Sequence, residues 1–63
     1  MKKGQLVVVK LYGGKTAVRR VVAVRRDVVV ICAEEEYMAA ELEGREPRGL
    51  GFPIADVQEE EFV

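Results

Sequence analysis

The sequence has no histidine and no serine, and its only cysteine is Cys32. A structural zinc site is built mainly from histidine and cysteine, and an internal disulfide needs two cysteines, so neither is expected. A serine–histidine pair is excluded as a catalytic nucleophile, and nothing near Cys32 marks an activated thiolate. We therefore expect no enzyme activity, no cofactor and no bound metal, and we interpret Cys32 as a small buried hydrophobic residue.

Long hydrophobic runs are also missing. The longest, Val28 to Ala33, has six residues, whereas a membrane span needs about 20. Lys2 and Lys3 are followed by Gly4 and not by a long apolar segment, so no signal peptide is expected. These features predict a cytoplasmic protein with no membrane partner, and no small-molecule substrate is inferred.

The chain is short. With 63 residues it is expected to form a single domain, 1–63, that buries only about 60% of the surface its unfolded state exposes. Small domains of this kind gain stability from disulfides, metals or oligomerisation, and only oligomerisation is open to this sequence.

Basic and acidic residues are segregated along the chain. Residues 1–31 hold eight lysines and arginines against one aspartate, a net charge of +7, and residues 32–63 carry a net charge of −8. Either the two halves fold against each other and largely cancel, or they present complementary faces to a partner.

The first half has the β-branched residues and turn signals of a β-meander, and the second half combines a helix with a short strand. Three glutamates on the first helical turn favour the helix, which Gly44 ends, and apolar residues alternate from Leu50 to Ile54. The capping-box spacing of Asp56 and Glu59 predicts a helical turn beginning at Val57. The predicted strands cover about 5–12, 16–26, 28–33 and 49–54, and the predicted helix covers about 34–43.

Two turns predict the strand register and the core. A two-residue turn at Gly13 and Gly14 would pair Val9 with Val18. The second turn, either a tight turn at Arg26 and Asp27 or a four-residue loop, would pair Val24 with Val29. One face of the sheet then collects the predicted core: Val7, Val9, Leu11, Val18, Val22, Val24, Val29 and Ile31. Arg20 falls on the same face, which predicts that the second strand bends there.

The order of these elements resembles the SH3-like small barrels. The opening run from Lys3 to Val9 is similar to the first strand of KOW-type barrels, found in ribosome- and transcription-associated proteins, and this resemblance implies RNA binding. The stretch from Glu34 to Val57 resembles small uncharacterised bacterial proteins. The predicted fold class is therefore mainly β, an SH3-like small barrel of four to five strands with one short α-helix inserted before the last strand. The alternative is an open meander with the helix packed across one face.

The second face of the predicted sheet is also apolar, and the short helix is expected to cover only part of it. An exposed apolar patch usually marks an interface, so the leading hypothesis is a non-enzymatic interaction module that self-associates as a homodimer. The candidate interface consists of Leu6, Val8, Val21, Ala23, Val28 and Val30. Because Val21 is expected to point away from the core, Val21→Glu is expected to dissociate the dimer and leave the fold intact.

Nucleic-acid binding is the alternative function. Basic side chains and one aromatic residue on the first two strands would form the kind of patch that binds single-stranded nucleic acid. The candidate contacts are Lys10, Tyr12, Lys15, Arg19 and Arg25. The acidic pI of about 5.4 and the available glutamates favour pairing of the arginines within the protein or across a dimer.

Overall fold

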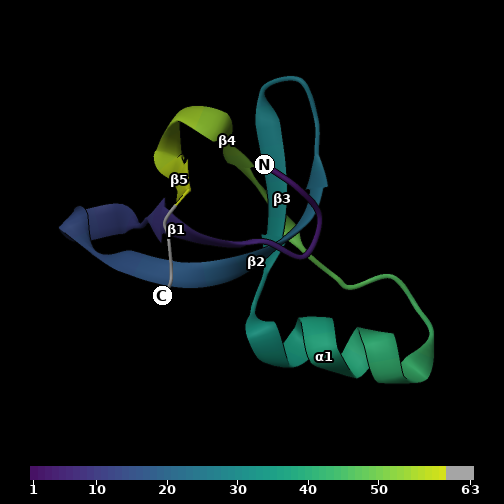
Figure 1. The fold of residues 1–63 in the computed structure, drawn as a ribbon. Coiled ribbons are helices and arrows are strands. Elements are labelled where there is room, and N and C mark those ends of the chain that lie inside the picture. The colour runs from purple at the N-terminus through teal and green to yellow at the C-terminus, as the bar shows by residue number, and fades with distance from the viewer. Residues whose placement is uncertain (60–63) are drawn as a thin grey trace.

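The structure, a computed structural model, describes residues 1–59 and is mainly β, as predicted (Figure 1). Five antiparallel strands form one sheet in the order β4-β3-β2-β1-β5. The strands are β1 (Leu6–Lys10), β2 (Thr16–Val24), β3 (Val28–Cys32), β4 (Leu50–Pro53) and β5 (Val57–Glu59). Helix α1 (Glu34–Glu43) lies between β3 and β4, and one-turn 3-10 helices stand at η1 (Tyr12–Gly14) and η2 (Ile54–Asp56).

The last strand, β5, was missed by the sequence analysis. The predicted helical turn lies three residues earlier, at η2, where the Val57 N–H donates to the carbonyl of Ile54. Val57 is buried and pairs with Val9, so the chain returns to the free edge of β1 as a strand. Burial of one β-branched side chain and pairing with an open edge outweigh the capping-box signal.

The register of the first hairpin differs from the prediction by one residue. Lys10 pairs with Thr16 and Val8 with Val18, because η1 makes the loop longer than a two-residue turn. The loop is closed by a 2.7 Å hydrogen bond from the Leu11 N–H to the Lys15 carbonyl. Since side chains alternate along a strand, this slip exchanges the two faces of the first half of β2.

Arg19 and Arg20 therefore exchange sides. We call the side of the sheet that carries the core the inner face and the opposite side the outer face. Arg19 lies on the inner face opposite Val7, and Arg20 lies on the outer face between Leu6 and Cys32. Val18, predicted in the core, is 47% exposed on the outer face.

A β-bulge at Val22 restores the predicted register in the second hairpin. Val24 pairs with Val29 as predicted, and residues 25–27 connect the two strands, closed by a hydrogen bond from the Arg25 N–H to the Val28 carbonyl. On the other side of the bulge Ile31 pairs with Val21, whereas the predicted register pairs it with Val22. The strand bends here, so β3 crosses the β1–β2 ribbon at a steep angle (Figure 1).

The inner face holds a compact apolar core. Its buried members are Val7, Val9, Val21, Val29, Ile31 and Val57, with Met1, Leu11, Ala17 and Phe52 packed against them. Of the predicted core, Val22 is buried outside this cluster and Val24 is 44% exposed.

Helix α1 lies against β2 through a small contact. Its only fully buried residue is Ala40, whereas Met38 and Leu42 are 58% and 89% exposed. Gly44 ends the helix in the left-handed conformation as predicted, and the Arg45 N–H caps the Ala40 carbonyl. The apolar ridge of the helix therefore points away from the sheet.

Candidate interaction surfaces

Arg20 joins three parts of the chain at one end of the outer face. Its Nη1 donates to the Gly4 carbonyl at 2.6 Å, and its Nη2 pairs with Glu34 Oε1 at 2.5 Å. The guanidinium carbon lies 5.9 Å from the centre of the Tyr37 ring, within the range of a cation–π contact. The N-terminal turn and the first turn of α1 are thereby held on β2.

A cleft of about 320 Å³ opens beside this Arg20 contact. It is lined by Gly4, Arg20, Glu34, Tyr37, Met38 and Glu41. The helix supplies four of these six residues, and two of those four are glutamates. Arg20 is the one cation among the lining residues and is already paired with Glu34.

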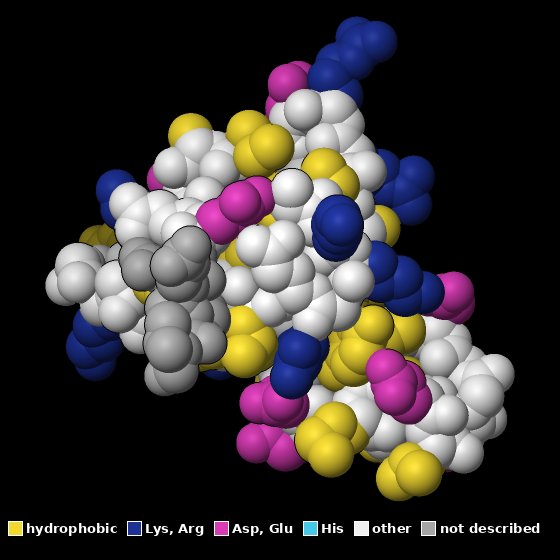
Figure 2. All heavy atoms as spheres, in the orientation of Figure 1, with side chains coloured by type: hydrophobic (Ala, Val, Ile, Leu, Met, Phe, Trp, Pro, Cys, Tyr) yellow, Lys and Arg dark blue, Asp and Glu magenta, His cyan; other side chains and the backbone are white. Residues whose placement is uncertain are grey.

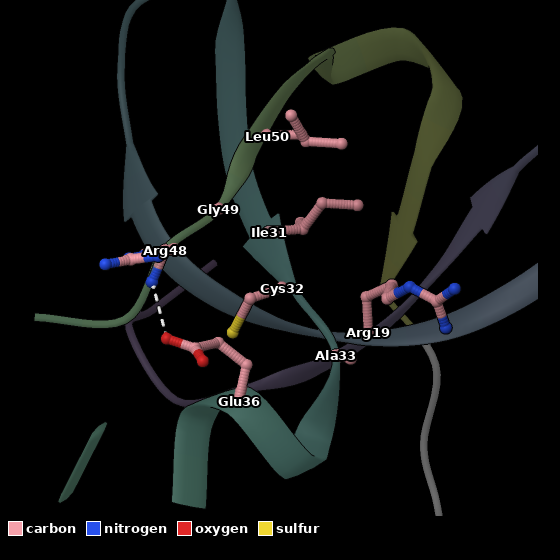
Figure 3. Close-up of a pocket in the computed structure, with 8 residues that line it drawn as sticks. All are labelled: Arg19, Ile31, Cys32, Ala33, Glu36, Arg48, Gly49 and Leu50. Carbon is pink, nitrogen blue, oxygen red and sulfur yellow. Dashed lines mark hydrogen bonds between the residues drawn. The ribbon is translucent and has the colours of Figure 1, made fainter. Parts of the chain in front are cut away.

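Glu36 organises the segment after the helix. Its Oε2 accepts hydrogen bonds from Arg45 Nη1 at 2.6 Å and from the backbone N–H of Arg48 at 2.9 Å, the second drawn in Figure 3. Arg45 also pairs with Glu43 at 3.0 Å. The hydrogen bond from Arg45, followed by that from Arg48, lowers the pKa of Glu36 to about 2.

This pKa predicts an acid-sensitive contribution to stability. Because the folded pKa of Glu36 lies below its ordinary value of 4.5, the unfolded state binds more protons between these values. The contribution is complete above pH 4.5 and is lost as the pH falls towards 2. Glu36→Gln removes this titration. We therefore expect its thermal unfolding midpoint, measured by circular dichroism, to fall less between pH 4.5 and pH 2 than that of the wild type. A variant whose acid dependence matches the wild type would contradict the prediction.

A second pocket, of about 340 Å³, lies where β3 leads into the helix (Figure 3). The side chains of Ile31 and Leu50 point in the same direction, and the guanidinium groups of Arg19 and Arg48 point in opposite directions. The two cations therefore do not converge on one ligand atom.

Cys32 lines the same pocket and is buried. Burial, and after it the charge of Glu36, raises the pKa of its thiol, while Arg20 acts in the opposite direction. A thiol with a raised pKa is a poor nucleophile, in agreement with its interpretation as a packing residue.

The candidate interface residues do not all share one exposed face. Val21 is wholly buried in the core, so its inclusion was wrong; the bulge at Val22 and the slipped register place it on the inner face. Leu6 and Val8 lie on the outer face of β1, partly exposed, beside Val18. The remaining members lie on the outer face around the second hairpin: Ala23, Val28 and Val30.

The candidate nucleic-acid contacts are split between sites. Lys10, Tyr12 and Lys15 gather at the tip of the β1–β2 hairpin, which we call the basic tip, and Tyr12 is 100% exposed there. Arg25 lies at the other end of β2, and Arg19 lines the second pocket. On the face shown in Figure 2 the basic side chains are spread over the surface and form no single patch.

Sequence reasoning missed the cleft and the role of Arg20. The sequence does signal that a charge in the middle of the second strand is costly to bury. The predicted register, however, places Arg20 on the core face, whereas the structure places it on the outer face. Glu34 and Tyr37, three residues apart on the predicted helix, were the partners to consider.

Comparisons of this chain with protein-family models, with curated proteins and with solved structures gave no match. Within residues 1–59 no helix is both long and apolar enough to cross a membrane, and the same residues contain no cluster of three or more potential metal ligands.

Proposed function

We propose that this chain is a non-enzymatic protein-interaction module that associates with a second copy through the outer face of β1 and β2. The observation that carries the proposal is the apolar stripe of Leu6, Val8 and Val18, which is partly exposed and reaches 47% exposure at Val18. Helix α1 is held over the Arg20 end of this face and leaves the stripe open. Burial of such a stripe yields about 25 cal/mol per Å² of apolar surface removed from water.

We further propose that the architecture is an SH3-like small barrel in a cytoplasmic protein. The strand order, with a single helical turn between β4 and β5, supports the SH3-like barrel. A lone, buried cysteine in a chain without disulfides supports the cytoplasmic location.

Val18→Lys tests the proposed interface. A lysine at the centre of the stripe is expected to weaken self-association at least tenfold, because its charge would be desolvated in the dimer. Val24→Lys is the matched control, since Val24 is exposed to a similar degree, 44%, and lies beside the second hairpin turn. Both variants are expected to retain the wild-type circular dichroism spectrum. Equal dissociation constants for Val18→Lys and the wild type in sedimentation velocity would contradict the interface.

Nucleic-acid binding is a second candidate, favoured by the exposed Tyr12 between Lys10 and Lys15. An aromatic ring beside cations suits base stacking, and affinity would fall steeply with salt. The acidic pI of about 5.4 and the separation of Arg25 from the basic tip favour the protein contact.

A further inference from the structure

The outer face of the β1–β2 hairpin has Val8 at its centre. Tyr12, at the basic tip, is four residues after Val8, and Gly4, on the wall of the cleft, is four residues before it. At about 3.3 Å per residue, each lies no more than about 13 Å along the chain from Val8. A two-fold axis through the Val8–Val18 pair would therefore bring the basic tip of one copy opposite the cleft of the other.

The two ends are chemically complementary. The basic tip carries Lys10 and Lys15, neither of which pairs with a carboxylate within residues 1–59. Glu41, on the cleft, likewise has no basic partner in the described part of the chain, and Glu34 is 48% exposed despite its contact with Arg20. Opposite charges at facing positions attract, and like charges would repel.

The apolar groups are complementary as well. Tyr12 is fully exposed on a loop whose two glycines, Gly13 and Gly14, leave the ring uncovered. The cleft offers the side chain of Met38, a residue that is 58% exposed, and the ring of Tyr37. Aromatic–aromatic and sulfur–aromatic contacts are favourable beyond the surface that they bury.

We propose that two copies form a closed dimer in which each inserts Tyr12 into the α1 cleft of the other, with Val8 and Val18 packed around the two-fold axis. The proposal rests on the proposed function and names the contact through which self-association occurs. Because each copy gives one tip and one cleft to the same partner, the contact closes and does not propagate into a filament. The expected assembly has twice the 7.0 kDa mass of the chain.

A charge-exchange experiment tests the contact. The double variant Lys10→Glu with Lys15→Glu places like charges at the tip and cleft of its homodimer, and Glu41→Lys does the same with the opposite sign. The homodimer of each variant alone is expected to have a dissociation constant at least tenfold higher than that of the wild type, measured by sedimentation velocity. An equimolar mixture is expected to recover the dimeric species, because both contacts of the mixed dimer again join opposite charges.

The controls change the same charges elsewhere. Glu35→Lys is on α1 but outside the cleft lining, and Arg25→Glu with Arg26→Glu alters the other hairpin end. The dissociation constants of both control variants are expected to lie within twofold of the wild-type value. Tyr12→Ser is expected to weaken association at least tenfold without affecting the fold, since the ring is fully exposed.

The outcomes separate this contact from the proposed function. A wild type that self-associates and is disrupted by Val18→Lys, but is unaffected by the charge variants, would overturn the tip-and-cleft contact and retain the interface. A wild type that stays monomeric would overturn both. If that monomer bound a single-stranded oligonucleotide, and the double tip variant abolished binding, the basic tip would be assigned to nucleic acid.

Discussion

Val21→Glu is expected to abolish cooperative folding. Val21 has no exposed surface and lies at the centre of the core, opposite Ile31. A carboxylate there would be buried without a partner, and its neutral form would still lack a hydrogen-bond partner among valines. Domains of this length have a stability of only about 3–9 kcal/mol, at roughly 0.05–0.15 kcal/mol per residue, so the cost is comparable to the whole free energy of unfolding.

Val18→Glu is the matched control for this prediction. It introduces the same side chain three residues away on β2, at a position that is 47% exposed. We expect a sigmoidal thermal transition by circular dichroism for Val18→Glu and none for Val21→Glu. If Val21→Glu melted cooperatively near the wild-type midpoint, the inner-face position of Val21 and the bulge that places it there would be wrong.

Gly49→Ala is expected to destabilise the protein through a clash with the neighbouring strand. A Cβ at Gly49 would lie 2.7 Å from the backbone carbonyl oxygen of Ile31 and 2.8 Å from a methyl group of Val30. Because the first neighbour is backbone, β4 would have to move away from β3, a strain that typically costs about 1–3 kcal/mol. For a domain of this size each kcal/mol lowers the thermal midpoint by about 4–8 °C, so the midpoint is expected to fall by roughly 8–16 °C for a cost of about 2 kcal/mol.

Gly51→Ala, two residues later and within β4, is the control. Its Cβ would approach only a methyl group of Val28, a side chain that is 38% exposed and free to turn outward. We expect a shift of the midpoint less than half that of Gly49→Ala. Equal shifts would contradict the close approach of the β3 backbone at Gly49.

The elements of the fold follow closely from local sequence signals. Residues 34–43 form the helix as expected, because three glutamates at its start, good helix formers in its body and Gly44 after its end act in the same direction. Four strands, and the pairing of Val24 with Val29, also follow from β-branched runs and turn residues.

The side of the sheet to which each side chain points was predictable only where the turn is short and the pairing of the strands is regular. Two adjacent glycines indicate a turn at residues 13 and 14, but not whether the loop closes with two residues or with a 3-10 turn of three. That one residue exchanges Arg19 with Arg20 and exposes Val18. The bulge at Val22 then brings Val21 into the core, and no local signal marks it, since any β-branched residue of this run could occupy the bulge.

The candidate site depends on these same details. The cleft exists because Arg20 reaches the outer face, where it meets Glu34 and Tyr37 from a helix that begins 14 residues later in the chain. Charge segregation in the sequence anticipates such pairing between halves, which the structure shows for Arg20 with Glu34 and for Lys3 with Glu46. It does not indicate which cations stay exposed at the basic tip.

Self-association is the central claim, and sedimentation equilibrium of the wild-type protein tests it most directly. The measurement is made from about one to several hundred micromolar, a range that brackets dissociation constants typical of modest specific dimers. We predict a mass that rises with concentration from 7.0 kDa, the mass of the chain, and levels off at twice that value. A mass that remains at 7.0 kDa throughout this range would contradict the proposed function.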